Sequence, residues 1–132
     1  MPAIHHQIHI ERTPEFVWDA VRDVGALHTR LVPGFVTATE MLTGVPTPTR
    51  RVTFANGAVA DEVIVDNDDE RRRLAWSIKS VEHHNGVMTV REAEGGTLVT
   101  WTADVLPADL AERFSPMMAQ GLATMKAHLE HS

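Results

Sequence analysis

Glu62 is the polar residue in this sequence that is best placed to do chemistry. It lies in an apolar, β-branched run that continues through Val63 and Ile64. A carboxylate that points from such a run into an apolar pocket can orient a ligand hydroxyl or act as a general acid or base. A carboxylate on the opposite face would be solvated and paired with a basic residue, and the sequence leaves both orientations open. We expect Glu62→Gln to leave folding nearly intact and to weaken recognition of a hydroxylated ligand.

Eight histidines raise the question of a metal site, because imidazole is a common zinc ligand. His5, His6 and His9 lie close together, but alternation along a strand places His6 on the opposite face from the other two. No acidic residue nearby completes the spacing of a zinc motif. We therefore expect no metal and no cofactor. His28, near a short helix, and His83, beside a turn, are the histidines that we consider for proton transfer at the mouth of a pocket.

Covalent catalysis is disfavoured by what the sequence lacks. It contains no cysteine, no Gly-x-Ser-x-Gly motif and no glycine loop of the kind that binds phosphate. The basic run Arg71–Arg73 follows an acidic turn and predicts surface ion pairs. The candidate catalytic residues are therefore Glu62, His83 and His28, each acting through proton transfer.

Composition limits the class of protein and its partners. With 132 residues and 43% hydrophobic content, we expect a single domain, residues 1–132, that buries a core. The 18 acidic and 12 basic side chains leave a formal charge of −6, which opposes binding to nucleic acid or anionic membranes. No apolar stretch approaches the roughly 20 residues that span a bilayer, and the N-terminus has no signal-peptide pattern. We expect a cytoplasmic protein without integral membrane insertion.

The elements that must position these residues follow from the periodicity of the apolar side chains. Alternation over 4–10 predicts a strand, and Thr13-Pro14 begins a helix that runs to about Asp23. A brief second helix is expected at 26–31. Further strands are predicted at 36–42, 49–55, 58–66, 72–81, 86–93 and 97–106. Strands so close along the chain must pair antiparallel.

A long helix is predicted at the C-terminus. Leu110 and Phe114 begin an apolar stripe that continues to Leu129 at helical spacing. Ser115-Pro116 indicates a kink or a restart, because proline removes a helical hydrogen bond but is well accepted behind a serine cap. We therefore expect a short leading turn and a main helix at 116–130.

One amphipathic helix is narrower than a sheet of about seven strands, so bulky side chains or a cavity must occupy the remaining space. Three tryptophans, six methionines and no tyrosine favour a large and adaptable apolar interior. Either these side chains simply form the core, or they line a ligand site. The ligand-binding candidates are Phe35, Phe54, Glu62, Trp76, Ile78, Met88, Val90, Trp101, Phe114, Met118, Gly121, Leu122 and Met125.

The chain resembles the START-like (SRPBCC) superfamily, in its polyketide cyclase/dehydrase and lipid-transport branch. The segments that carry the resemblance are 8–10, 13–18, 62–66, 73–78 and 99–102, and together they extend over essentially the whole chain. The resemblance implies an α+β helix-grip (START/Bet v 1-like) fold. In that fold a seven-stranded antiparallel sheet wraps around a long C-terminal helix, two short helices follow the first strand, and a cavity lies between sheet and helix.

A narrower resemblance is to the plant abscisic-acid receptors. It rests on Asp61-Glu62, on the run 68–72 and on Glu82-His83-His84. It implies that Glu62 faces a cavity and that His83 lies in a loop at its mouth. The receptors' pocket lysine has no clear counterpart in this sequence, so hormone sensing is not implied.

Three functions remain open at this point. The first is a carrier or binding protein that encloses a small hydrophobic or aromatic molecule, gated by segments around 28–35, 54–60 and 82–86. The second is a cyclase/dehydrase-type enzyme in which the cavity folds a reactive chain and Glu62 or a histidine moves a proton. The third is a protein that acts through its surface. A strand edge near 36–42 would allow a homodimer.

Overall fold

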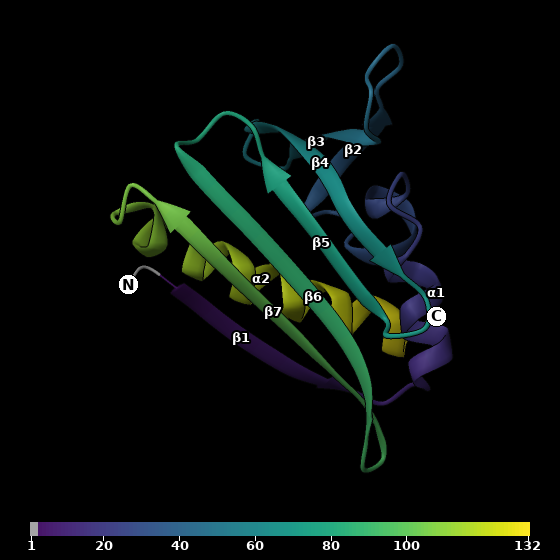
Figure 1. Cartoon of the computed structure of the whole chain (residues 1–132). Coiled ribbons are helices and arrows are strands. Elements are labelled where there is room, and N and C mark those ends of the chain that lie inside the picture. The colour runs from purple at the N-terminus through teal and green to yellow at the C-terminus, as the bar shows by residue number, and fades with distance from the viewer. Residues whose placement is uncertain (1–2) are drawn as a thin grey trace.

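The computed structural model describes residues 3–132, which contain one seven-stranded antiparallel sheet (Figure 1). Its strands are β1 (Ala3–Ile10), β2 (Val36–Met41), β3 (Thr49–Phe54), β4 (Val59–Asp68), β5 (Arg73–Ile78), β6 (His83–Ala93) and β7 (Gly96–Leu106). They lie in the order β1-β7-β6-β5-β4-β3-β2, so β1 and β2 form the two edges. All neighbours except β1 and β7 are consecutive in the chain, as antiparallel strands with short connections require.

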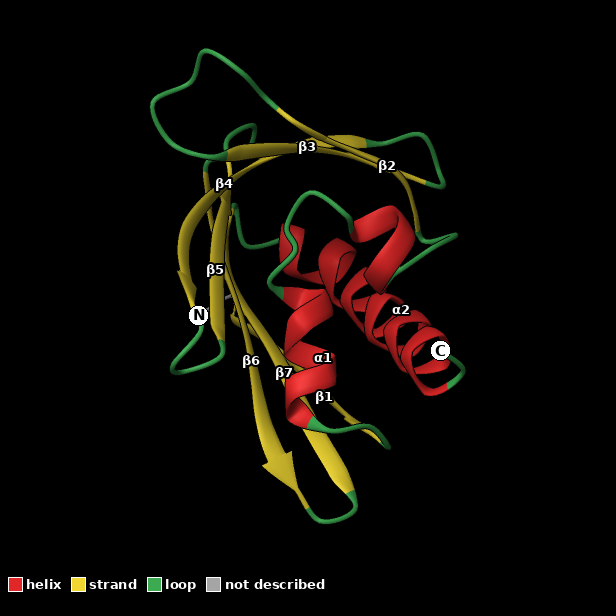
Figure 2. Ribbon diagram, turned by 90° about the vertical axis from the view of Figure 1, so that its right-hand side faces the viewer, coloured by secondary structure: helices red, strands yellow, loops and turns green. Residues whose placement is uncertain are grey.

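The helices are α1 (Pro14–Val21), a short π-helix η1 (Leu27–Leu31) and α2 (Leu110–Glu130). Thr13 begins α1 as expected, because its side chain accepts a hydrogen bond from the Phe16 backbone N–H at 3.2 Å. All the helices lie on the concave face of the sheet (Figure 2). The α+β arrangement of a seven-stranded antiparallel sheet and a long C-terminal helix, predicted from the sequence, is confirmed.

Two β-bulges accompany the curvature of the sheet. The register shifts between Val36 and Ala38 on β2, and between Ile64 and Asp66 on β4. An extra residue bends a strand and increases its twist. The strands that carry them, β2 and β4, belong to the half of the sheet that bends over the helices (Figure 2).

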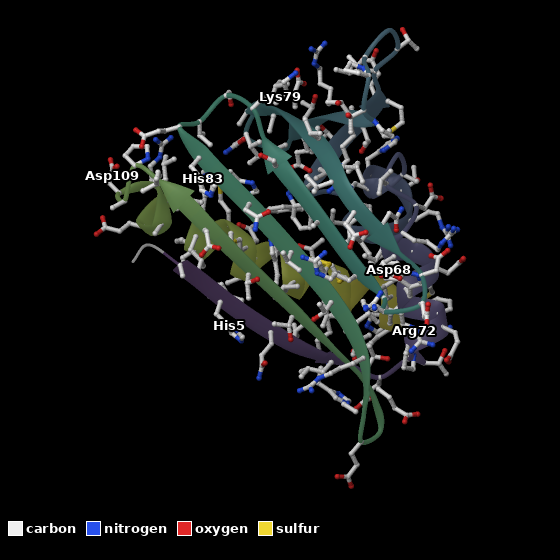
Figure 3. The ribbon with its side chains drawn as sticks, viewed as in Figure 1. His5, Asp68, Arg72, Lys79, His83 and Asp109 are labelled. Carbon is white, nitrogen blue, oxygen red and sulfur yellow. The ribbon has the colours of Figure 1, made fainter. Side chains whose placement is uncertain are left out.

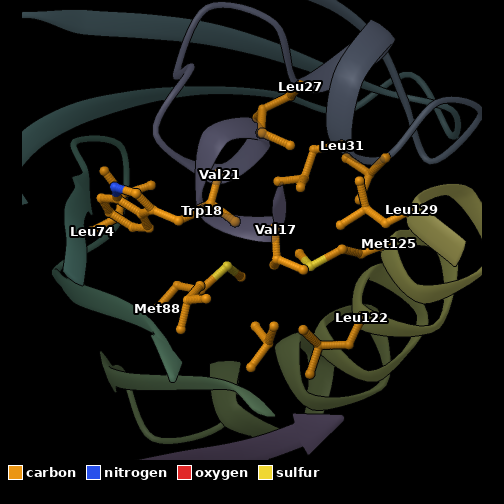
Figure 4. Packing of buried hydrophobic residues seen from close by; sticks show 14 of the residues in the cluster. Val17, Trp18, Val21, Leu27, Leu31, Leu74, Met88, Leu122, Met125 and Leu129 are labelled. Carbon is orange, nitrogen blue, oxygen red and sulfur yellow. The ribbon is translucent and has the colours of Figure 1, made fainter. Parts of the chain in front are cut away.

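The main hydrophobic core lies where α1 and the C-terminal half of α2 face the sheet (Figure 4). Val17 and Val21 of α1 are completely covered, and Met125 and Leu129 of α2 are almost so. Met88 reaches this cluster from β6. Burial of each such side chain contributes about 1.5–3 kcal/mol relative to exposure. This end of the molecule is therefore filled by side chains.

Polar contacts fix the C-terminal end of α2 at the β1 edge. Lys126 Nζ donates to the His9 backbone carbonyl at 2.7 Å, and Arg12 Nη1 donates to the Leu129 backbone carbonyl at 2.8 Å. The second contact also satisfies one of the carbonyls that a helix end leaves without an intrahelical partner. α2 is thereby held against one edge of the sheet and not over its centre.

The predicted restart of the last helix at Ser115-Pro116 is wrong, because α2 is continuous from Leu110 to Glu130. Proline inside a helix costs about 3 kcal/mol. The helix continues because its apolar stripe stays on one face across Pro116, with Leu110 before it and Met118 after it both buried.

The connection between β5 and β6 also differs from the prediction. β5 ends at Ile78 and not at residue 81, and β6 begins at His83 and not at residue 86. His83 and His84 therefore belong to a strand, and His83 directly follows the turn. β6 extends this far because β7 offers it backbone partners up to Leu106. Histidine, asparagine and glycine have weak strand propensity, so the sequence pattern gave no sign of this extension.

Gly96 opens β7 at a point where the backbone of β1 leaves no room for a side chain. A Cβ atom there would lie 2.2 Å from the Ile10 carbonyl oxygen. We expect Gly96→Ala to lower the free energy of unfolding by about 3 kcal/mol, at the upper end of overpacking costs, because the neighbour is backbone. Urea unfolding followed by circular dichroism measures this loss.

Gly95→Ala is the matched control for this prediction. Gly95 has a φ of 75°, and nothing lies within 4 Å of the place where its Cβ would be. This variant therefore tests only the left-handed backbone, which costs an ordinary residue about 1–2 kcal/mol. Equal losses for the two variants would show that the approach to Ile10 is not the cause.

Candidate functional site

A cavity of about 370 Å³ lies between the concave face of the sheet and the helices. The backbone of α2 lies closest to β1 and β7, so α2 leaves the inner face of β3, β4 and β5 uncovered. The wall is formed by η1, by inward side chains of β2 to β7 and by α2 from Leu110 to Met125, and most of it is apolar. A concave apolar space with a few polar groups is the usual form of a small-molecule site.

Every ligand-binding candidate except Val90 and Leu122 contributes to the wall of this cavity. The wall residues among them are Phe35, Phe54, Glu62, Trp76, Ile78, Met88, Trp101, Phe114, Met118, Gly121 and Met125. Val90 and Leu122 have the expected inward orientation but are buried in the main core, beside α1. Ligand contact by the wall residues stays a prediction.

Glu62 points inward and is 6% exposed. Its Oε1 accepts a hydrogen bond from Arg50 Nε at 2.8 Å, and Arg50 is only 3% exposed. Arg50 Nη1 also donates to the Val24 backbone carbonyl, and the guanidinium lies 5.5 Å from the centre of the Trp76 ring. Glu62 is thus part of a buried ion pair on the cavity wall.

Arg50 was not among the residues predicted from the sequence, although a signal was present. Arg50-Arg51 on β3 faces Asp61-Glu62 on β4, and the register pairs Arg50 with Glu62 and Arg51 with Asp61. Because side chains alternate between faces, one pair lies inside and the other outside. The signal in the sequence was two adjacent basic residues on one predicted strand and two adjacent acidic residues on the next. This pattern predicts two ion pairs, one on each face of the sheet.

His28 and His83 do not line the cavity. His28 lies in η1, where its Nδ1 lies 3.1 Å from Thr39 Oγ1. His83 is exposed at the start of β6, near Lys79 and at the end of the sheet opposite Asp68 and Arg72 (Figure 3). Because β6 begins earlier than predicted, the inward residue is the next histidine along the chain.

His84 is that inward histidine, and it is 5% exposed on the cavity wall. Its Nδ1 accepts a hydrogen bond from the Ile78 backbone N–H at 3.2 Å, which places the ring proton on Nε2. Burial and, to a smaller extent, the neighbouring His83 lower the pKa of His84 from 6.5 to about 4. At neutral pH the ring is therefore an uncharged N–H donor.

Aromatic rings surround these polar groups. The rings of Trp76 and Trp101 are 5.7 Å apart between centroids, and both line the cavity. Gly86 makes room for the rings of Trp76 and His84, since a Cβ there would lie 3.0 Å from both His84 Cε1 and Trp76 Cε2. Trp101 Nε1 is completely covered and has no hydrogen-bond partner within residues 3–132. An aromatic or flat apolar molecule would find complementary faces here.

The histidines of β1 are separated as the alternation predicted. His5 is exposed, whereas His6 faces α2 and its Nε2 lies 2.8 Å from Ser115 Oγ. Across residues 3–132 no three histidine, cysteine, aspartate or glutamate side chains are grouped so that they could hold a metal ion. In the same part of the chain, no helix combines the length and the apolar character needed to cross a membrane.

Two open depressions lie on the surface. One, of about 690 Å³, is bordered by 11–14 and 92–96, and the other, of about 510 Å³, lies on the outer side of β5 and β6. Both are open to solvent and neither is enclosed by sheet and helix. The buried ion pair and His84 make the inner cavity the better candidate for function.

The buried ion pair leads to a prediction about stability. Arg50→Met leaves the Glu62 carboxylate buried without its partner, so we expect a loss of about 3–5 kcal/mol in the free energy of unfolding. Replacing both residues by methionine removes the uncompensated charge, so the double variant should recover most of the loss. Urea unfolding of the two variants measures both values.

The outward pair provides the control. Arg51 Nε lies 2.8 Å from Asp61 Oδ1, but the two side chains are 46% and 31% exposed. Because water screens this pair, Arg51→Met should cost less than about 1 kcal/mol. A loss as large as that of Arg50→Met would contradict the role assigned to burial.

His84 leads to a prediction about pH. Its pKa in the folded protein, about 4, lies below the ordinary value of 6.5, so the unfolded state binds more protons between these values. Stability should therefore fall as the pH falls through this window, by up to about 3 kcal/mol at about 1.4 kcal/mol per unit. The Gln side chain of His84→Gln cannot titrate, so this variant should lose less stability than the wild type between pH 6.5 and pH 4. Urea unfolding above pH 6.5 and near pH 4 measures the free energy of unfolding of both proteins. The same pH dependence in both proteins would rule His84 out as its source.

Similar folds occur among solved structures. XoxI from Bacillus cereus superposes with a TM-score of 0.84 at 20% identity, covering 98% of this chain and 97% of its own. A protein from Nitrosospira multiformis gives a TM-score of 0.83 at 15% identity, covering 97% and 96%. Ara h 8.0201 gives 0.74 at 14% identity, covering 98% of each chain. At these identities the likeness shows the fold, which is the Bet v 1-like helix-grip fold expected from the sequence.

Comparison with protein families extends beyond the fold. No curated protein matches the sequence. The model of the family described as polyketide cyclase / dehydrase and lipid transport matches residues 1–130. This match confirms the resemblance to the START-like (SRPBCC) superfamily, and the chain belongs to the polyketide cyclase/dehydrase and lipid transport family.

Proposed function

We propose that the protein binds a small hydrophobic or aromatic molecule in the cavity between the sheet and α2, as a carrier or binding protein. The observation that carries the proposal is the cavity itself, which is apolar over most of its wall and contains a buried ion pair and an uncharged histidine. A protein whose interior only had to be stable would fill this space, because each unfilled cavity costs stability.

The walls of the cavity include parts of the segments that we expect to gate it. Phe35 follows η1, and Phe54 lies 5.7 Å from it between ring centroids. Val59 borders the cavity from the start of β4 although it is 56% exposed, and Val81 borders it from the β5–β6 connection, directly before the expected segment 82–86. Ligand entry between these segments requires movement of loops and not of the sheet.

A cyclase/dehydrase-type enzyme is the second candidate. The observation that favours it is Glu62, a carboxylate on the wall of an apolar cavity. A group in this position could exchange a proton with a bound substrate, and the cavity shape would orient a reactive chain. Chemical turnover of a bound compound would distinguish an enzyme from a carrier.

A protein that acts only through its surface would have no use for the cavity, which disfavours the third hypothesis.

A homodimer forms part of the same proposal. β2 is an edge strand, so its outer backbone groups are available for pairing with the β2 strand of a second copy. Native mass spectrometry of the protein purified from its own host reports the subunit count together with any retained small molecule. A monomer mass at high protein concentration would remove the homodimer from the proposal.

The binding proposal is tested with N-phenyl-1-naphthylamine, an uncharged probe whose fluorescence rises in apolar surroundings. Ala60 lies on the cavity wall, and Ala60→Phe would place a ring in the cavity. We expect this variant to weaken probe binding by about tenfold or more, which corresponds to about 1.4 kcal/mol. Fluorescence titration measures the dissociation constants.

Val63→Phe is the matched control, because Val63 lies on the outer face of the same strand, opposite Ser77. It adds a similar ring without entering the cavity, so probe binding should stay unchanged. Equal affinity for the wild type and both variants would mean that the probe binds elsewhere. Absence of binding to the wild type would count against the proposed function.

A further inference from the structure

Three buried polar side chains cross the inner face of the sheet on nearly one level, and we call them the polar belt. Arg50 on β3 pairs in register with Glu62 on β4, and Glu62 pairs with Ile78 on β5. His84 on β6 is joined to the same level through its hydrogen bond from the Ile78 backbone N–H. The rest of the wall near the belt is mainly apolar, including Trp76 and Phe114.

The polar belt carries no net charge. The Arg50 guanidinium and the Glu62 carboxylate compensate each other at 2.8 Å, and the buried His84 ring is neutral above about pH 4. Arg113 on α2 also borders the cavity, but its side chain is exposed, so its charge is solvated and is not part of the belt. A ligand that reaches the belt therefore meets no uncompensated charge.

The belt retains unused hydrogen-bonding capacity. Within residues 3–132, Arg50 Nη2, Glu62 Oε2 and His84 Nε2 have no hydrogen-bond partner, whereas the other polar atoms of these side chains are engaged. None of these three atoms is completely covered by protein. Two of them are donors and one is an acceptor, so they suit a molecule that offers both oxygen acceptors and a hydroxyl donor.

We infer that the ligand is an uncharged apolar molecule with a carbonyl and a hydroxyl group, which hydrogen-bond to the polar belt. This inference rests on the proposed binding function and names its ligand class. A carboxylate ligand would be disfavoured, because it would bring a second negative charge beside Glu62 while Arg50 is already neutralised. A hydrocarbon would also be disfavoured, because it would strip the belt of water and leave its free atoms unpaired.

The test uses three naphthalene probes of nearly the same shape. 6-Acetyl-2-naphthol is uncharged and has both groups, 6-hydroxy-2-naphthoate replaces the ketone by a carboxylate, and 2-ethylnaphthalene has neither. Isothermal titration calorimetry at neutral pH measures their dissociation constants. We expect 6-acetyl-2-naphthol to bind about tenfold or more tightly than each of the others. Equal or tighter binding of the naphthoate would overturn the inference.

Glu62→Gln gives the inference a second test that a purely structural role would not satisfy. The variant keeps the size of the side chain but leaves the belt with the single buried positive charge of Arg50. It therefore loses stability, contrary to the sequence-based expectation that folding stays nearly intact. We expect the preference to reverse, with 6-hydroxy-2-naphthoate binding more tightly than 6-acetyl-2-naphthol. A variant that is folded by circular dichroism and keeps the wild-type preference would overturn the inference.

His84→Gln is the charge-neutral counterpart, since it changes a belt residue without changing the net charge. This variant should still bind 6-acetyl-2-naphthol more tightly than 6-hydroxy-2-naphthoate. A reversed preference in His84→Gln would contradict the charge argument.

Ala60→Phe separates the proposed binding function from the inferred ligand class. If all three probes bind equally and this variant weakens them all, the cavity binds ligands but the belt does not select them. If none of the probes binds to the cavity, the proposed function fails as well.

Discussion

The interior of this protein is governed by a mismatch in width between one helix and a seven-stranded sheet. Seven strands at a spacing of about 4.8 Å span about 30 Å, whereas an α-helix with its side chains is about 10–12 Å wide. Lys126 and Arg12 hold α2 at the β1 edge, so it covers that side of the sheet. α1 and η1 cover part of the remainder, and the space left between them and the sheet is the cavity.

The ion pair between Arg50 and Glu62 is best understood in relation to this space. Removing two charges from water is expensive, and apolar residues of similar size often stabilise a core better. The pair lies on a cavity wall with atoms that remain free to bond, and not in the filled core formed by residues such as Val17 and Leu129. Low polarity around it strengthens each hydrogen bond that a ligand would add. The same low polarity makes an unmatched ligand charge costly, so under the proposed binding function the cavity would select by charge as well as by shape.

Much of the candidate site could be predicted because strand alternation and helix periodicity are local properties. The inward positions of Trp76 and Trp101 and the apolar stripe of α2 were recognised in this way. The direction of Glu62 could not be decided, because it depends on pairing with Arg50 twelve residues earlier in the chain. His84 was missed in favour of His83, because the sequence pattern placed both outside the strand, where side chains follow no alternation. Once β6 extends to His83, His84 has the same inward parity as Met88.

By itself the sequence determined the order and type of the elements, the family and the apolar nature of the interior. These follow from side-chain periodicity, caps such as Thr13 and composition, which act over a few residues or over the whole chain. The tertiary structure alone decided that α2 continues through Pro116, that Glu62 is paired inside, and that His84 is the buried histidine. Each of these outcomes depends on contacts between segments distant in the chain, where burial and desolvation outweigh local preference.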